Sequence, residues 1–300
     1  MTDWMLVAGG FALGGFFLGL WAMVPLRKLA FERACIGLNR NFAKEIFPTN
    51  IPDDEVKFLL IGDQGSGNKF QKHVAASSFK TAEDLGCDFT LLLGDNFIQH
   101  GVQAIDDPQF KNKFEDMYQH DMPFYAVLGN HDLRNSWTSI IDYTGVSKRW
   151  NLPAADYEFE AGPVKFHAFN STCTVCSVWP LFKKTEKPWK ISFGHHPVLS
   201  SGRHGHMTWL ERWIYLRSGS DFLISGHNHL MEHLQLKGVE LITSGGGGSP
   251  LHPEDLKQLP QSIYLNEAYG YAWAHFTPSK AVIKFFDDQG AEVYEYQKDR

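Results

Sequence analysis

Five short apolar runs of this 300-residue chain end in glycine followed by residues that bind metals or move protons. They are K-F-L-L-I-G-D-Q-G (57–65), F-T-L-L-L-G-D-N-F (89–97), F-Y-A-V-L-G-N-H-D (124–132), I-S-F-G-H-H-P (191–197) and F-L-I-S-G-H-N-H (222–229). An apolar run that stops at a turn residue is typical of a buried β-strand. Open α/β sheets place their chemistry beyond the carboxyl ends of such strands. We therefore expect the Asp, Asn and His residues after these glycines to meet at one edge.

The side chains at this predicted edge are those of a metal centre. Carboxylate, amide and imidazole donors come from Asp63, Asp95, Asn130, His195, His227 and His229. This mixture suits Mn, Fe or Zn better than calcium, and six donors exceed what one tetrahedral zinc ion takes. They suit two metal ions about 3.5–4 Å apart with a bridging carboxylate, which together activate water and polarise a phosphoryl group. Positions 227 and 229 have the spacing of two that places side chains on one face of a strand.

Predicted helices alternate with these strands. Strands are expected at 57–62, 89–94, 124–129, 190–194 and 222–226, and helices at Lys69–Leu85, about Pro108–Tyr118 and 207–217. Asp63, Asp95 and Asn130 follow one another at intervals of 32 and 35 residues, the length of a β-α-β unit. The β-rich segments are a hairpin-like stretch at 157–169, then 233–244 and three strands within 270–297, with a close-passing loop at Gly245–Gly248. This order predicts two sheets packed face to face with helices outside.

Composition excludes some classes of function. The net charge of −6 and the absence of a basic run in the body of the chain predict no nucleic-acid partner. The four cysteines are too few and too scattered for a disulfide framework. Cys173 and Cys176 could form a redox pair, a disulfide or half of a zinc site. No second C-x-x-C completes a zinc site, which favours an incidental pair in a loop.

The N-terminus has the pattern of a membrane anchor. Trp4–Leu26 contains 23 residues without a charge, close to the roughly 20 that cross a bilayer. Asp3 and the lack of Lys or Arg before this stretch favour a retained anchor over a cleaved signal peptide. The predicted domains are an anchor at 1–26, a basic amphipathic stalk at 27–54 and a catalytic domain at 55–300.

The flanks of the anchor bear on orientation and assembly. Five basic residues follow it, Arg27, Lys28, Arg33, Arg40 and Lys44, so the positive-inside rule predicts a cytoplasmic domain. The stalk either lies along an anionic leaflet or is an ordinary helix. Within the anchor, Gly10, Gly14, Gly15 and Gly19 have the spacing of a helix-pairing motif. They indicate a homodimer or only the frequent use of glycine in such helices.

The five strand endings resemble motifs of the calcineurin-like metallophosphoesterase superfamily, in its purple or tartrate-resistant acid phosphatase branch. The branch motifs G-D-x-G, G-D-N-F-Y, G-N-H-D, G-H-Y-P and G-H-x-H correspond in order to 62–65, 94–98, 129–132, 194–197 and 226–229. The likeness spans about 55–250. It implies a four-layer α/β/β/α sandwich of two mixed β-sheets flanked by helices, preceded here by one transmembrane helix. It also implies phosphoester hydrolysis with two divalent metal ions.

The resemblance further implies a role for each residue. Asp63 and His229 would hold the first metal, Asn130, His195 and His227 the second, and Asp95 would bridge them. His131 would give a proton to the leaving oxygen, and His204 would line the substrate pocket. Asn96 and His196 are further candidates for substrate contact, with a surface histidine as the alternative for His196.

Two positions depart from the branch. Ile98 replaces the tyrosine whose phenolate binds the first metal and gives the purple colour, and His196 replaces a second tyrosine. Isoleucine cannot ligate a metal, so ferric iron is less favoured than divalent Mn, Fe or Zn, and we expect a colourless enzyme. Water, His100 or a neighbouring side chain could fill the vacant position.

These observations predict a membrane-anchored, metal-dependent phosphoesterase that acts on phosphate mono- or diphosphate esters. The anchor and basic stalk favour a lipid-linked substrate, while soluble phosphomonoesters fit a site that faces water. The alternative is a non-catalytic membrane scaffold that retains the fold, which Ile98 would suit. Six intact ligands and His131 favour the enzyme. Charge bias places the domain in the cytoplasm, whereas the resemblance to secreted enzymes places it in the periplasm or outside the cell.

Overall fold

The computed structural model describes residues 42–172 and 181–300, which lie in one compact unit, Asn39–Arg300. The predicted anchor, most of the basic stalk and the pair Cys173 and Cys176 lie outside the described residues. Within the two described ranges, no helix is both long and apolar enough to cross a membrane.

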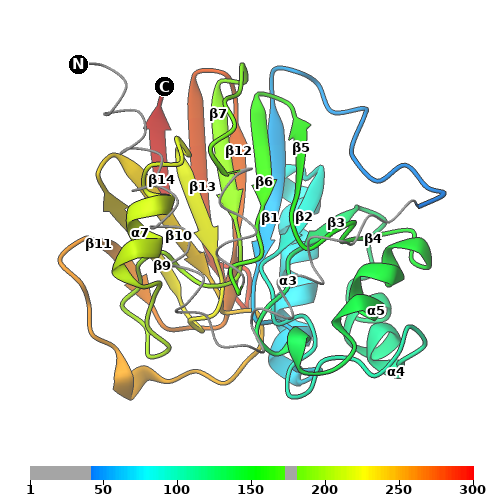
Figure 1. Cartoon of the computed structure of the whole chain (residues 1–300). Helices are drawn as coiled ribbons and strands as arrows, with labels where there is room; N and C mark the ends of the chain where they lie inside the picture. The colour runs from blue at the N-terminus through cyan, green and yellow to red at the C-terminus, as the bar shows by residue number, and fades with distance from the viewer. Residues whose placement is uncertain (1–41, 173–180) are drawn as a thin grey trace, which may run out of the picture. The chain divides into compact units, whose positions relative to one another are not determined.

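Two seven-stranded mixed sheets form the frame of this unit (Figure 1). The first has the order β14-β13-β12-β1-β2-β3-β4, with β1 at Val56–Ile61, β2 at Phe89–Leu92, β3 at Phe124–Ala126, β4 at Trp150–Asn151, β12 at Gly270–Phe276, β13 at Lys280–Asp287 and β14 at Glu292–Asp299. The second has the order β11-β9-β10-β8-β7-β6-β5, with β5 at Tyr157–Ala161, β6 at Val164–Ala168, β7 at Trp189–Phe193, β8 at Phe222–Ser225, β9 at Met231–Leu236, β10 at Val239–Ser244 and β11 at Ser262–Asn266.

Strand register brings the metal-type loops to common edges. Strands β1 to β4 run parallel, and Ile61 pairs with Leu92, which in turn pairs with Ala126. In the second sheet β7 and β8 run parallel, with Phe193 paired with Ile224. Because neighbouring parallel strands end level, the loops that follow them start side by side. The α/β class with two mixed sheets is as predicted.

Aromatic side chains fill the space between the two sheets. Phe58 of β1 packs edge to face on Phe166 of β6, with ring centres 5.3 Å apart. Phe89 of β2 meets the same ring at 5.5 Å, and Trp189 of β7 meets Phe276 of β12 at 5.7 Å. All five rings are completely buried. Edge-to-face packing adds to the burial of large apolar surfaces, so this layer fixes one sheet against the other.

Helices cover the outer faces of both sheets. Helix α3 (Lys69–Leu85) begins at Asn68, whose side chain accepts from two backbone N–H groups of the first turn. The Thr81 hydroxyl of α3 lies 2.7 Å from the Tyr271 hydroxyl on β12. Helix α7 (Trp209–Tyr215) starts with a capping box and packs its Ile214 and Tyr215 against the second sheet.

One predicted helix is present but differs in type and length. In place of a helix over 108–118, the chain forms a short α4 (Pro108–Phe110) followed by a π-helix, η1 (Lys111–Glu115). Phe110 stacks on Tyr143 with ring centres 3.7 Å apart, and Phe114 packs against Trp150 at 5.0 Å. Tertiary packing of both rings, which sequence periodicity does not contain, sets this backbone.

Several short elements were not predicted at all. They are β4, β11, α5 (Trp137–Asp142) and the 3₁₀ turns η2 (Asp132–Arg134), η3 (Tyr143–Gly145) and η4 (Pro253–Asp255). Elements of two to six residues are too short to show a period of their own.

His120 generates a prediction about acid stability. Its ring is sandwiched between Phe124 and Phe79, and neither ring nitrogen has a hydrogen-bond partner. Burial, aided by the charge of Arg149, lowers the pKa of His120 to about 4. Because this pKa is below the value in the unfolded chain, the contribution of neutral His120 to stability is fully present above pH about 6.5. It is lost as the pH falls towards 4. His120→Phe should therefore raise the free energy of unfolding by about 1–2 kcal/mol more at pH 5 than at pH 8.

Chemical denaturation at the two pH values measures this difference. His206→Phe is the matched control, because His206 is an exposed histidine outside the core. An equal gain at both pH values for His120→Phe would contradict the explanation.

Candidate metal centre

Three candidate ligands directly follow strands in a left-handed backbone conformation. The φ angles are 58° at Asp63, 53° at Asp95 and 68° at His227. Residues other than glycine rarely adopt positive φ, and such strain gathers at functional sites. This conformation falls two or three residues after the strand ends, so these side chains lie at the sheet edge.

Close backbone approaches explain the glycines of the motifs. A Cβ atom on Gly129 would lie 2.2 Å from Asp95 Oδ1, and one on Gly226 would lie 2.6 Å from Asp63 Oδ2. The predicted close-passing loop at Gly245–Gly248 is confirmed, since the Gly247 N–H donates to the Gly62 carbonyl at 3.0 Å. No side chain fits at these positions, so the ligands on neighbouring loops can approach one another.

Four predicted ligands surround one nitrogen of His195. Its Nε2 lies 3.2 Å from Asn130 Oδ1, 3.4 Å from Asp95 Oδ1 and 4.0 Å from Asp63 Oδ1. His227 Nδ1 lies 3.2 Å from the same nitrogen. Asp63, Asp95 and His195 are buried and are close enough together to hold one ion.

His229 joins the cluster through Asp63. Its Nε2 lies 3.7 Å from Asp63 Oδ1. The structure therefore brings all six predicted ligands together, and both His195 and His229 lie within 4.0 Å of Asp63 Oδ1.

The hydrogen bonds of the cluster leave donor atoms that fit a cation. Asp63 Oδ1 is buried and accepts no hydrogen bond, while Oδ2 accepts from the His227 N–H at 2.7 Å. His195 uses Nδ1 to bond the Leu93 carbonyl at 2.8 Å, and His229 uses Nδ1 to bond the Pro250 carbonyl at 2.6 Å. Metal-binding histidines characteristically donate their second N–H in this way, which aims the Nε2 lone pair at the ion.

Electrostatics lead to the same conclusion. Burial, together with the charge of Asp95, raises the pKa of Asp63 well above its usual range. Burial alone would raise the pKa of Asp95 too, but the charge and hydrogen bond of His195 lower it. Burial opposes protonation of His195, yet the two carboxylates raise its pKa to about 9. Two buried carboxylates thus attract one positive charge, and a metal ion can take the place of the proton.

The other two imidazoles have the opposite tendency. Burial lowers the pKa of His227, and the neighbouring imidazole of His195 lowers it further. Burial also lowers the pKa of His229 to about 4. Both rings are therefore neutral at pH 7, which is the form that ligates metals.

Asp132 is not among the predicted site residues, although it organises the loops. Its carboxylate accepts from the backbone N–H groups of Asn96, Phe97 and Gly129 and from the Asn96 side chain, at 2.8–3.2 Å. The Asn96 amide also donates to the Val127 carbonyl. Asn96 is 3% exposed and fully engaged in this network, so its geometry indicates scaffolding instead of the predicted substrate contact.

The remaining predicted residues lie around the rim. The His131 N–H donates to Asp95 Oδ1 at 2.8 Å, and its side chain is 25% exposed. The His196 ring centre lies 4.3 Å from that of His227, and the exposed His204 ring lies 5.2 Å from it. His100 is exposed, and within the described ranges no hydrogen bond or ion pair joins its imidazole to a candidate ligand.

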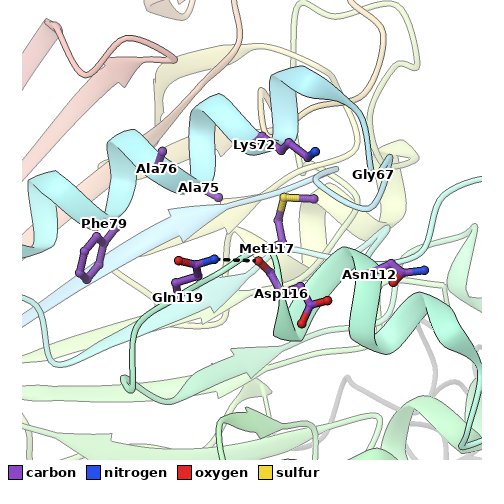
Figure 2. A pocket seen from close by; sticks show the side chains of 9 residues that line it. All are labelled: Gly67, Lys72, Ala75, Ala76, Phe79, Asn112, Asp116, Met117 and Gln119. Atoms are coloured by element: carbon purple, nitrogen blue, oxygen red, sulfur yellow. Dashed lines mark hydrogen bonds between the residues drawn. The ribbon is translucent and has the colours of Figure 1, made fainter.

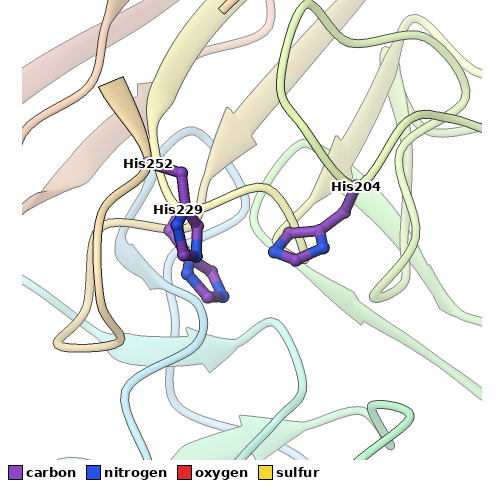
Figure 3. Close-up of side chains that lie close together, drawn as sticks. All are labelled: His204, His229 and His252. Atoms are coloured by element: carbon purple, nitrogen blue, oxygen red, sulfur yellow. The ribbon is translucent and has the colours of Figure 1, made fainter. Parts of the chain in front are cut away.

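The structure adds one histidine that the motifs do not contain. Donor atoms of His204, His229 and His252 lie within 4.8 Å of one another (Figure 3). His252 follows the glycine-rich loop as a single histidine, so sequence spacing has no pattern that could reveal it.

A separate pocket lies between α3 and the segment around η1 (Figure 2). Its lining includes Lys72 and Phe79 from α3 and Asp116, Met117 and Gln119 from the segment after η1. Asp116 is the one carboxylate among the lining residues and is paired with Lys111 at 2.5 Å. This pocket contains none of the predicted ligands and has no donor set for a metal.

Two buried carboxylates allow a matched test of the site. Asp63→Asn removes a charge whose Oδ1 atom has no partner, so it should raise the melting temperature of metal-free protein. It should also abolish the further rise that Mn²⁺ or Zn²⁺ gives the wild type, a stabilisation of about 2.7 kcal/mol at a hundredfold excess over Kd. Asp132→Asn is the control. It places an N–H₂ group against at least one of the four N–H donors, so it should lower the melting temperature with and without metal.

Thermal unfolding with and without added metal measures both variants. A metal-induced rise in Asp63→Asn equal to that of the wild type would contradict the assignment of Asp63 to the metal centre.

Comparison with known proteins gives the family. The model of the calcineurin-like phosphoesterase family matches residues 56–231. Purple acid phosphatase 3 of Arabidopsis thaliana is 25% identical over 286 residues, covering 82% of this chain and 78% of that protein. Human tartrate-resistant acid phosphatase type 5 is 26% identical over 290 residues, covering 80% of this chain and 89% of that protein.

Solved structures share the fold. A Plasmodium structure described as GAP50, the anchor in the inner membrane complex, has a TM-score of 0.72 at 23% identity, covering 82% of this chain and 89% of that one. The yellow lupin purple acid phosphatase PPD1 has a TM-score of 0.64 at 14% identity, covering 85% of this chain and 55% of that one. Because the family model spans more than half of the 300 residues, this chain belongs to the calcineurin-like phosphoesterase family.

Proposed function

We propose that this chain is a membrane-anchored, metal-dependent phosphoesterase that hydrolyses phosphate mono- or diphosphate esters. The observation that carries the proposal is the buried, unpartnered Asp63 Oδ1 between His195 and His229. A buried carboxylate oxygen without a partner is costly unless a cation satisfies it. The acid phosphatases among the relatives support the reaction class.

The proposed ligand sets divide around Asp95. Asp63 and His229 would hold the first ion, Asn130, His195 and His227 would hold the second, and Asp95 would be shared. The distances support this division, since Asn130 and His227 both lie 3.2 Å from His195 Nε2, whereas His229 lies 3.7 Å from Asp63. Bound Mn, Fe or Zn ions would polarise the phosphoryl group and lower the pKa of a water nucleophile.

The proposed proton donor to the leaving oxygen is His131. The Gln99 N–H lies 3.3 Å from its Nδ1, and the Arg134 guanidinium lies 3.4 Å from its Nε2, so both ring nitrogens face a hydrogen-bond donor. That Nε2 lies 3.8 Å from Asp95 Oδ2, and the His131 side chain is partly exposed to solvent. A neutral oxygen leaves more easily than an alkoxide, so this proton counts most for substrates with poor leaving groups.

Activity measurements test the reaction and the acid together. The full chain should lose hydrolysis of an alkyl phosphate after chelation and regain it with Mn²⁺, Fe²⁺ or Zn²⁺. His131→Asn should lower kcat for the alkyl ester by about 10²–10⁴ and should lower it less for a nitrophenyl ester, which needs no acid. His206→Asn, an exposed histidine outside the centre, should match the wild type. Equal losses of His131→Asn on both esters would rule out the acid role.

A substrate at the membrane surface is the second part of the proposal. The uncharged stretch at Trp4–Leu26 and the basic residues after it support a chain held against an anionic leaflet. A phosphate ester anchored in the same bilayer would then meet the active site at a high local concentration. The membrane side and the homodimer predicted from the anchor glycines stay predictions.

Reconstituted vesicles test this preference. The full chain should hydrolyse a long-chain lipid phosphate in its own vesicles at least about tenfold more efficiently than a short-chain soluble analogue. Equal efficiency for both would overturn the lipid-linked substrate and leave soluble phosphomonoesters.

A non-catalytic scaffold is the second candidate. The fold shared with the Plasmodium protein described as an anchor and the presence of Ile98 favour it. The six converging donors and His131 favour the enzyme. If the fully metal-loaded protein hydrolyses no phosphate ester, the enzyme is excluded and the scaffold is the remaining candidate.

A further inference from the structure

Three imidazoles next to the proposed first metal ion form a cluster of their own. His204 points across a small pocket towards His229 and His252 (Figure 3). Their donor atoms lie within 4.8 Å of one another, a separation that could suit a third metal ion. Three imidazoles bind a metal only if each turns an unprotonated nitrogen to it. Their hydrogen bonds show which of them can.

His229 turns a lone pair towards Asp63. Its Nδ1 bonds the Pro250 carbonyl, so this nitrogen carries the hydrogen and Nε2 does not. Nε2 is the atom 3.7 Å from Asp63 Oδ1. His229 thus has one nitrogen for a metal, and that nitrogen faces the dinuclear centre.

His252 has the opposite tautomer. The Arg203 Nη1 lies 3.0 Å from His252 Nδ1. A guanidinium group only donates hydrogen bonds, so Nδ1 accepts and the hydrogen of the neutral ring is on Nε2. The backbone N–H of His252 donates to a Glu267 carboxylate oxygen, and Arg203 is held in turn by Asp255 at 3.3 Å. His252 is therefore a fixed hydrogen-bond donor at Nε2 and not a ligand.

His204 faces this donor across the pocket. The rings of His204 and His252 are 5.6 Å apart, and those of His204 and His229 are 5.1 Å apart. The backbone N–H of His204 donates to Asn228 Oδ1 at 2.9 Å, and this hydrogen bond fixes the loop that carries His204. One ring nitrogen of His204 and one of His252 lie no more than 4.8 Å apart, so the two rings can share one oxygen at about 2.8 Å from each.

We propose that His252 is a substrate-binding residue whose Nε2–H, together with His204, holds an oxygen of the phosphoryl group beside the first metal ion. The inference rests on the proposed function. Arg203 donates to His252 Nδ1 and so favours the tautomer with the hydrogen on Nε2. Its guanidinium group also adds positive charge next to the anion. The ligand class is a phosphate monoester or orthophosphate, whose oxygens accept such bonds.

Phosphate binding tests this contact apart from turnover. Calorimetry of the metal-loaded full chain with inorganic phosphate should show His252→Ala binding about tenfold more weakly than wild type, the loss typical of one hydrogen bond to a charged group. His252→Gln, whose amide can still donate, should recover part of the affinity. Arg203→Ala should also weaken phosphate binding, because without the guanidinium group the His252 hydrogen is no longer kept on Nε2. His206→Ala, exposed and outside the cluster, should match wild type.

Zinc content separates this role from a third metal site. Wild type and His252→Ala should hold the same number of zinc ions after equilibrium dialysis. Unchanged phosphate affinity in His252→Ala overturns the proposal, and so does the loss of one zinc ion or a failure of loaded wild type to bind phosphate. Ester hydrolysis with unchanged phosphate affinity in His252→Ala would reject only this inference. Weaker phosphate binding in His252→Ala by a chain that hydrolyses no ester would reject only the proposed reaction.

Discussion

The burial of the Asp63 carboxylate beside that of Asp95 is the constraint on which this site depends. Both residues are almost inaccessible to water, and one oxygen of Asp63 has no hydrogen-bond partner. Isolated buried charges are expensive, so a compensating positive charge must be present in the folded chain. In metal-free protein the protonated His195 ring supplies this charge, because its pKa is raised to about 9. A pair of divalent ions would compensate the charges more fully and would also use the lone pairs of the surrounding imidazoles.

The rest of the fold holds these charges in place. Level strand ends start the loops together, and the aromatic layer around Phe166 prevents the sheets from sliding apart. Asp132 then ties the loop after β2 to the loop after β3 through its accepted N–H groups. The left-handed residues and close-packed glycines are stable only because this frame over-determines them.

Local patterns in the sequence predict much of this arrangement. Each strand that carries a ligand ends in glycine and a polar residue, so the positions of these strands along the chain and the six converging donors follow from short-range signals. Helix α3 has the predicted bounds because its cap and periodicity are local. The π-helix at Lys111–Glu115 differs from prediction because its contacts with Tyr143 and Trp150 are distant in sequence.

Long-range contacts explain what the sequence does not reveal at the site. His252 reaches the cluster from a loop with no motif, and its tautomer depends on Arg203, about fifty residues away. Asn96 has the residue type of a substrate contact, but Asp132 and Val127 engage its amide. Only the fold shows which hydrogen bonds a side chain already makes, because residue type and spacing do not determine them.

The metal content of the full chain, purified without chelators and measured by elemental analysis, tests the central claim most directly. The account predicts about two ions of Mn, Fe or Zn per chain, because the six donors suit a pair of ions. A content near zero that stays unchanged after incubation with each of these metals would contradict it.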